Sequence, residues 1–330
     1  GYNLKNMKNK TIKILTKIDD VGKRLDILLN ENINELTRSN IKNVIKSKQV
    51  KVNNKIVTSQ STKIKEGNIV ELNYEKKTDE KIFPSNKKVE IIYEDSDIIV
   101  VNKPQGLVVH PGAGNKKDTL VNILVGKYKN KLSNINGQLR PGIVHRLDKD
   151  TSGVIVIAKN NFSHSELGKQ FSDHTIKRKY YALIWGSLRP LKGKINTLIA
   201  RSKKNRQLMT VDEFRGKKAI TNYKTISTFE KKDIPKISFV EFTLETGRTH
   251  QIRTHMVFMG TSILGDQKYK KRNLKFKKLD KKFFNLLDNL NGQALHAFHL
   301  SFVHPTSLNH IKFETELPIK FKKLVNFLKK

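Results

Sequence analysis

The first part of the chain carries two helical patterns of apolar residues. Residues 22–33 place four apolar side chains at roughly helical spacing: Leu25, Ile27, Leu28 and Ile33. Residues 36–50 repeat the pattern, with Thr37 or Ser39 as a candidate N-cap and one apolar face made of Ile41, Val44 and Ile45. Two adjacent helices are therefore expected.

A short alternating pattern follows these helices. Two runs flank Asn53 and Asn54, a dipeptide typical of a hairpin turn, and residues 67–74 have the alternation of a strand. These elements predict a compact α/β unit over residues 22–74, preceded by an N-terminal extension, residues 1–21. Residues 75–88 are polar, charged and contain Pro84, which predicts a linker.

The remaining residues, 89–330, are expected to form a second domain. A pair of strands is predicted within residues 89–104, and further strands at 153–159, 179–186, 219–229, 237–246, 294–304 and 310–317. Helices are predicted at 118–128, 161–174, 249–260 and 281–290, and at the C-terminus, where one face holds Phe321, Leu324, Val325 and Leu328. Many strands with few crossover helices favour an α+β fold with a mostly antiparallel mixed sheet.

The charge balance indicates a polyanionic partner. Among 330 residues, 65 Lys and Arg stand against 30 Asp and Glu, a net charge of +35. An A·T-rich coding sequence explains part of this excess, since Lys, Asn and Ile are all abundant, but such a protein still attracts phosphate backbones. No apolar run approaches the ~20 residues of a membrane-spanning helix. With no Cys and no signal-peptide pattern at the start, a cytoplasmic location is expected, and Met7 is a candidate start.

The segment "HRLDKDTSGV", residues 145–154, concentrates charge directly before an apolar run. A calcium loop would use Asp148, Asp150, Ser152 and Gly153, but Lys159 stands where that pattern needs a bidentate Glu. A zinc site on His250 and His255 lacks both Cys and the neighbouring Glu. The glycines of residues 112–118 match a phosphate loop poorly. We therefore expect no metal and no nucleotide cofactor.

Two interpretations of Asp148 remain from the residues alone. A reactive carboxylate must stay ionised while shielded from water, and a nearby guanidinium favours the charged form. Arg146, Arg248 and Arg253 are candidates for that guanidinium. Alternatively, Asp148 and Asp150 only hold the turn together, as Asp does in many loops.

The same segment resembles the signature of RluA/RluD-type RNA pseudouridine synthases, His-Arg-Leu-Asp followed by Thr-Ser-Gly. His145 favours this group over the RsuA group, which has Gly at that position. Further blocks resemble the family in the same order: "YEDSDIIVVNKPQGLVVHPG", "KRKYYALIWG", "LETGRTHQIRTHM", "LGDQKY" and "ALHAFHLSFVHP". Residues 22–74 resemble the ribosomal S-four-type RNA-binding module found before the catalytic domain of such enzymes.

The resemblance implies that the chain detaches a uracil from its ribose, rotates it and rejoins it through carbon 5. It implies that Asp148 is catalytic and that Arg253 pairs with it. It also implies that Tyr180 is catalytic, since this residue stacks on the flipped uracil and is a candidate to help remove the carbon 5 proton, whereas Tyr181 lies on the other strand face. Arg146 is implied to fill the gap that base flipping leaves in the RNA.

The other motif residues have less definite implied roles. His145, Arg248 and His250 are assigned to substrate binding, with bracing of the loop as the alternative for Arg248 and His250. Lys103 and Pro104 are expected to shape the wall of the site.

The resemblance also implies partners. The substrate is expected to be large-subunit ribosomal RNA, with transfer RNA as the alternative and a non-catalytic ribosome assembly factor as the rival function. No cofactor, no membrane and a monomer are expected. The Lys-rich run 268–282 either follows RNA phosphates or is a solvated loop.

Overall fold

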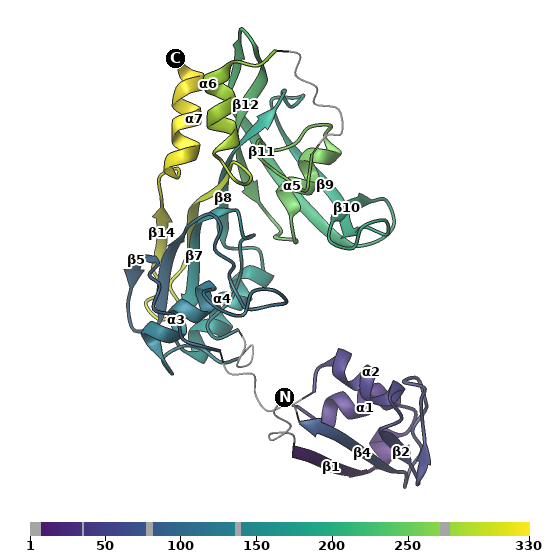
Figure 1. Cartoon of the computed structure of the whole chain (residues 1–330). Helices are drawn as coiled ribbons and strands as arrows, with labels where there is room; N and C mark the ends of the chain where they lie inside the picture. The colour runs from purple at the N-terminus through teal and green to yellow at the C-terminus, as the bar shows by residue number, and fades with distance from the viewer. Residues whose placement is uncertain (1–7, 35, 77–81, 136–139, 271–277) are drawn as a thin grey trace, which may run out of the picture. The chain divides into compact units, whose positions relative to one another are not determined.

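The chain forms two compact units that divide after residue 80 (Figure 1). The computed structural model describes residues 8–34, 36–76, 82–135, 140–270 and 278–330. Each unit has its own hydrophobic core.

The first unit packs two helices on a four-stranded antiparallel sheet with strand order β1-β4-β2-β3. Its elements are β1 (Lys8–Leu15), a short 3-10 helix (Ile18–Asp20), α1 (Leu25–Asn32), α2 (Arg38–Lys46), β2 (Val50–Val52), β3 (Lys55–Ile56) and β4 (Ile69–Lys76). Both predicted helices are present. Thr37 is the N-cap of α2, since its side chain accepts a hydrogen bond from Asn40 N at 3.1 Å.

The hydrophobic face of α1 differs in one position from the prediction. Leu25, Leu28 and Ile33 are buried, but Ile27 is 46% exposed and Leu29 is buried instead. Because a helix turns by 100° per residue, Leu29 lies above Leu25 on the core side, whereas Ile27 lies on the opposite side.

The boundaries of both units differ from the predicted ones. Strand β1 lies within the predicted N-terminal extension, yet it pairs with β4 along its whole length, so residues 8–15 of the extension are part of the sheet. The predicted linker is also partly structured. The carbonyl of Phe83 accepts a hydrogen bond from Asn122 Nδ2 at 2.7 Å, and Ser85 N donates to the Asn122 carbonyl, which ties residues 83–85 to the second unit.

The second unit is built on one ten-stranded sheet with the order β10-β9-β11-β12-β8-β13-β7-β6-β5, and β14 also pairs with β13. The strands are β5 (Glu90–Glu94), β6 (Ile98–Lys103), β7 (Ser152–Ala158), β8 (Lys177–Trp185), β9 (Lys192–Arg201), β10 (Met209–Asp212), β11 (Lys217–Lys231), β12 (Ile234–Leu244), β13 (Leu295–Val303) and β14 (His310–Glu314). All pairs are antiparallel except β7 with β13. The predicted α+β class with a mostly antiparallel mixed sheet is confirmed.

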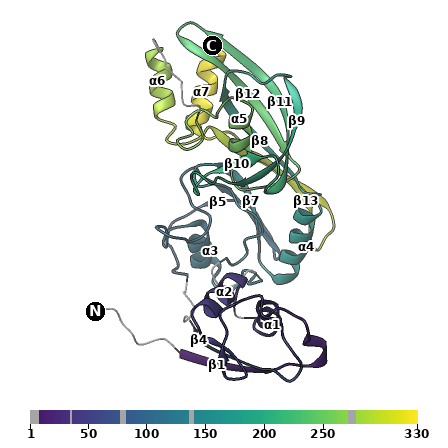
Figure 2. The same ribbon diagram turned by 90° about the vertical axis from the view of Figure 1, so that its right-hand side faces the viewer.

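Five helices accompany this sheet: α3 (Leu120–Tyr128), α4 (Asn161–Ser172), α5 (Gln251–Phe258), α6 (Lys281–Asp288) and α7 (Ile319–Lys329). Helix α5 packs against β9, β10 and β11, and α6 lies beside α7 (Figures 1 and 2). The predicted face of α7 is buried at all four positions. In the part of the chain that the structure describes, no helix is long and apolar enough to cross a membrane.

The parallel pair of β7 and β13 sets the position of the charged turn before β7. Ala297 is paired with Gly153, whose φ of +131° is unfavourable for other residues. A Cβ at Gly153 would clash with the Ala297 carbonyl. The glycine of "DTSG" therefore lets β13 approach closely and holds the preceding turn against the centre of the sheet.

Candidate active site

Asp148 lies in the tight turn before β7, beside a pocket of about 400 Å³. Thr151 N donates to the Asp148 carbonyl at 3.0 Å, which closes the turn. The pocket wall includes Val108, His110 and Arg146 on one side and His250 and Arg253 on the other. The carboxylate is 18% exposed, so a substrate can reach it while most of its surface is shielded.

Lys103 stabilises this turn from the protein interior. Its side chain is fully buried, and its ammonium donates to the carbonyls of Pro104, Leu107 and Lys149 at 3.0, 2.8 and 2.9 Å. Burial lowers the pKa of Lys103 to about 7, although the negative charges of Asp148 and Asp150 act to raise it. The contact with Lys149 fixes the backbone next to Asp148, in agreement with the expected role of Lys103 in shaping the site.

Arg253 of α5 contacts Asp148 as the motif implied. Its Nη1 donates to Asp148 Oδ2 at 3.0 Å, although the two residues are 105 positions apart. The same guanidinium forms two hydrogen bonds with Asp266, Nε to Oδ2 at 2.7 Å and Nη2 to Oδ1 at 2.9 Å. Burial alone lowers the pKa of Arg253, but the hydrogen bonds and charges of Asp266 and Asp148 raise it above its usual range. Arg253 is therefore a permanently charged, immobilised partner of Asp148.

His250 and Tyr269 complete this side of the pocket. His250 Nε2 lies 3.8 Å from Asp148 Oδ1, and its Nδ1 lies 2.6 Å from the Tyr269 hydroxyl. The same hydroxyl oxygen accepts a hydrogen bond from Met209 N at 2.8 Å. If the hydroxyl donates its own proton to Nδ1, the ring proton is on Nε2, the nitrogen nearer to Asp148. Burial lowers the pKa of His250, opposed by the charge of Asp148. His250 is the N-cap of α5 and has a left-handed backbone, with φ of 54°.

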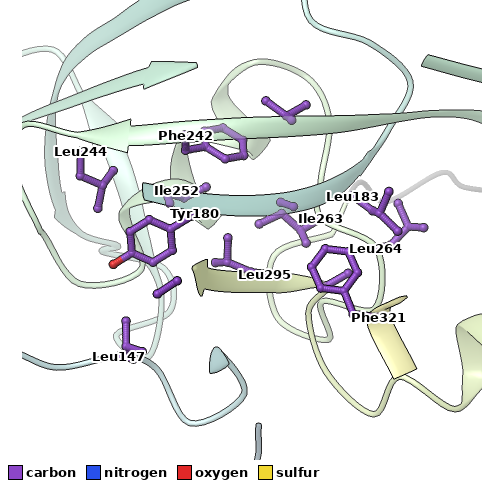
Figure 3. Packing of buried hydrophobic residues seen from close by; sticks show 14 of the residues in the cluster. Leu147, Tyr180, Leu183, Phe242, Leu244, Ile252, Ile263, Leu264, Leu295 and Phe321 are labelled. Carbon is purple, nitrogen blue, oxygen red and sulfur yellow. The ribbon is translucent and has the colours of Figure 1, made fainter. Parts of the chain in front are cut away.

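Tyr180 of β8 forms the apolar wall of a second, smaller pocket that shares Asp148, Arg146, His250 and Arg253 with the first. Its ring is 7% exposed. It packs near Leu147, Leu244, Ile252 and Leu295 (Figure 3). Burial raises the pKa of the Tyr180 phenol, with Arg178 opposing, so the ring presents a neutral face. Tyr181, expected on the other face of β8, stacks on Phe298 with ring centroids 3.8 Å apart.

Arg178 lies in the same pocket, two residues before Tyr180. Its Nε is buried and has no hydrogen-bond partner among the described residues. A Cβ at position 247 would crowd the Arg178 guanidinium, so Gly247 leaves room for this side chain. A buried donor without a partner is costly, and a bound anion or carbonyl oxygen would relieve that cost.

Arg146 and Arg248 also reach the site, on its open side. Arg146 is exposed, lines both pockets and lies with Nη1 3.2 Å from His110 Nε2. Arg248 lines the smaller pocket, and its Nε donates to the Lys218 carbonyl at 2.8 Å. Both positions suit contact with a large ligand that enters from solvent.

His145 does not belong to this group. Its Nε2 accepts a hydrogen bond from Val156 N at 3.0 Å, and its ring packs on Phe171 with centroids 4.7 Å apart. Burial lowers the pKa of His145 to about 3. In this structure His145 lines neither pocket and its imidazole braces β7, and its assignment to substrate binding stays a prediction.

The metal alternatives find no support in the side-chain contacts. Both ring nitrogens of His255 are hydrogen-bonded, to the hydroxyls of Thr221 and Thr197, so His255 offers no free zinc ligand. Among the described residues, Asp95, Asp97 and His304 have metal-ligand spacing. They do not line the pockets at Asp148, and His304 Nε2 is already paired with Asp95 Oδ2 at 2.7 Å.

Sequence reasoning assigned no role to Asp266, Tyr269 or Arg178. Asp266 and Tyr269 both lie in the block "LGDQKY" and Arg178 lies in "KRKYYALIWG", so the signal was present. The sequence did not show that Asp266 and Tyr269 contact Arg253, or that Arg178 lies in the same pocket as Tyr180. Residues 271–277 of the Lys-rich run 268–282 lie outside the described residues.

Comparisons with known proteins show the families that the two units match. The family model described as RNA pseudouridylate synthase matches residues 97–257, and the S4 domain model matches residues 23–70. The chain is 41% identical over 312 residues to "Ribosomal large subunit pseudouridine synthase D" of Zymomonas mobilis, covering 93% of this chain and 94% of that protein. It is 39% identical to the RNA pseudouridine synthase YlyB of Bacillus subtilis, covering 97% and 98%.

A solved structure has the same fold. The human RNA Pseudouridylate Synthase Domain Containing 4 superposes with a TM-score of 0.56 at 25% identity, covering 73% of this chain and 93% of that chain.

Proposed function

The chain belongs to the RNA pseudouridine synthase family and is an isomerase of that kind, and we propose that it modifies uridines of large-subunit ribosomal RNA with Asp148 as the catalytic carboxylate. The ribosomal substrate is supported by the names of the Zymomonas mobilis and Blochmanniella floridana relatives, both "Ribosomal large subunit pseudouridine synthase D". The net charge of +35 and the S4 domain support an RNA partner of some length. Such a substrate would be met in the cytoplasm.

One observation carries the assignment of Asp148. Arg253 binds its Oδ2, whereas Oδ1 accepts no hydrogen bond from the described residues, and Asp148 lines the pocket. A carboxylate held at one oxygen and open at the other can attack or deprotonate a substrate without moving. Because Arg253 is itself fixed by Asp266, the open oxygen is held in one position.

The reaction replaces one bond at the ribose C1′ carbon with another. The bond from C1′ to N1 of uracil breaks, the base turns, and a bond from C1′ to C5 forms. The hydrogen at C5 is released to solvent, and N1 gains a proton, so the product is an isomer of the substrate. Asp148 holds the negative charge that the first step needs, either as nucleophile or as base.

The surrounding side chains have complementary proposed roles. Tyr180 offers an apolar ring on which the flipped uracil stacks, and Arg146, exposed beside the pocket, enters the space that the base leaves in the RNA. Arg178 would donate its unpartnered Nε to a uracil carbonyl or the adjoining phosphate. Arg248 and His250 contact the RNA or brace the loop; His250 is close enough to Asp148 for either role.

Tritium release tests the proposed reaction and its substrate class together. Unmodified ribosomal RNA and transfer RNA, each with tritium at uracil C5, are incubated with the protein, and tritium in water is measured. Release from ribosomal RNA is the expected result. Release from transfer RNA alone would replace the substrate. No release from either, even from a ribosomal particle, would favour a non-catalytic assembly factor.

The first unit is proposed to bind RNA through α2. Arg38, Lys42 and Lys46 recur every four residues and are exposed, whereas Ile41 and Ile45 are buried. No carboxylate among the described residues lies within ion-pair distance of these three cations. Three unpaired cations along one helix face suit a phosphate backbone.

Removal of residues 1–80 is expected to weaken binding of ribosomal RNA and to flatten its salt dependence. The second unit keeps its own core, so circular dichroism should still show a cooperatively folded domain. Each lost phosphate contact reduces the slope of log K against log salt by about one. Filter binding at several salt concentrations measures this slope, and an unchanged value would exclude the first unit from the RNA contact.

A further inference from the structure

The turn between β10 and β11 presents Phe214 to solvent. Phe214 is 88% exposed, the highest value of any large apolar side chain in the described part of the chain. An aromatic ring this exposed buries almost none of its apolar surface in the fold, so its contribution to stability is small. We therefore ask which ligand could cover this ring.

This turn is held in one conformation. Asp212 Oδ1 accepts hydrogen bonds from Phe214 N and Arg215 N, both at 2.9 Å, and Asp212 Oδ2 lies 3.4 Å from Arg215 Nε. Gly216 follows with φ of +105°, where a Cβ would clash with the Ile199 carbonyl. A ring on a rigid turn loses little entropy when it binds a ligand.

The surroundings of Phe214 are strongly basic. Residues 201–218 contain seven Lys and Arg against two Asp and Glu. All seven cations are exposed: Arg201, Lys203, Lys204, Arg206, Arg215, Lys217 and Lys218. Of these, Arg215 alone is ion-paired with a carboxylate among the described residues. An exposed aromatic ring among unpaired cations suits single-stranded nucleic acid, whose bases stack and whose phosphates are attracted.

The turn is continuous with the site at Asp148. A groove of about 460 Å³ is lined by Arg215, Gly216 and Lys217 on one side and by Gly247 and Arg248 on the other. Gly247 and Arg248 also line the pocket that holds Tyr180. In addition, Arg248 Nε donates to the Lys218 carbonyl.

A second connection runs through β10. Met209 N at the start of this strand donates to the Tyr269 hydroxyl, which in turn contacts His250. Helix α5, which carries Arg253, packs directly against β10 (Figures 1 and 2). The basic turn and the Asp148 pocket are thus fixed to each other by side-chain contacts.

We propose that the β10–β11 turn is a second RNA-binding site, where an unpaired base near the target uridine stacks on Phe214. The groove lined by Arg215, Lys217 and Arg248 holds the phosphates between this base and the uridine at Asp148. The site selects RNA that is single-stranded on this side of the target. The proposal rests on the proposed function, since the same RNA occupies both sites.

Kinetics with three variants test the role of Phe214. Phe214→Ala is expected to raise KM for tritium release from ribosomal RNA about tenfold, because one base–aromatic stack is lost, and to leave kcat within twofold. Phe214→Trp retains an aromatic face and should restore KM. Phe162→Ala, on α4, removes a ring that is 60% exposed and lies outside the basic turn, and should match the parent. A KM for Phe214→Ala equal to that of Phe162→Ala would overturn the proposal.

Fluorescence of the Phe214→Trp variant tests the site independently of catalysis. The chain has one Trp, Trp185, which is 9% exposed, so an added Trp at position 214 reports from solvent. A single-stranded oligoribonucleotide should quench this emission more than the same strand in a duplex. Equal quenching by both would overturn the proposal, because phosphate attraction alone would explain it. If the parent released no tritium, the proposed function would fail, while this measurement would still test stacking.

Discussion

Asp148→Asn is expected to abolish tritium release from ribosomal RNA while RNA binding is retained. The amide has the size of the carboxylate but carries no charge, so it can act neither as nucleophile nor as base. Arg253 stays in place, since its two hydrogen bonds with Asp266 do not involve Asp148. Loss of such a group reduces kcat by about 10⁴-fold or more. Single-turnover tritium release measures the rate of the reaction, and filter binding measures the affinity for RNA.

Asp173→Asn is a matched control for this substitution. Asp173 is an exposed carboxylate at the C-terminal end of α4, outside both pockets. Its variant should keep the activity of the parent and show that charge removal as such is harmless. Appreciable turnover by Asp148→Asn, above the level of enzyme-free RNA, would remove Asp148 from the catalytic role.

Asp266→Ala is expected to lower both stability and activity. The Asp266 side chain is fully buried, and besides Arg253 it accepts hydrogen bonds from Lys268 N and Tyr269 N, both at 3.0 Å. Its removal leaves a buried guanidinium with Asp148 alone, together with unsatisfied donors. Breaking a buried ion pair on one side costs about 3–5 kcal/mol of unfolding free energy. Urea denaturation measures this loss.

The activity of Asp266→Ala reports on positioning. Without Asp266, Arg253 is no longer held, and Asp148 loses its defined orientation, so kcat should fall about 10²-fold under conditions where the variant is folded. The KM for RNA should change little, because Asp266 is buried beneath the site. Arg253→Lys, which keeps the charge but not the two-pronged contact, should lower kcat in the same direction. An unfolding free energy within 1 kcal/mol of the parent would contradict the proposed role of Asp266.

Local patterns of apolar and polar residues predict the helices and most strands of this protein. The cap of α2 and the apolar faces of α2 and α7 depend on neighbours within a few residues, so the sequence predicts them well. Strands β1, β9 and β10 were not predicted. They lie at or near sheet edges, where one side faces solvent and polar residues such as those of "KGKINTLIAR" interrupt the apolar alternation. Their pairing partners, distant in sequence, decide their conformation.

The amino-acid sequence identifies which residues of this protein are chemically equipped to act. Asp148, Arg253 and Tyr180 stand in motifs that resemble one enzyme family, and the excess of Lys and Arg indicates a polyanionic partner. Which of these residues meet depends on the tertiary fold. The fold brings Arg253 to Asp148, adds Asp266 and Tyr269 behind them, and turns His145 away to brace β7. The physical reason is that side-chain direction and long-range contact depend on how strands pair and where α5 packs, and no local pattern encodes either.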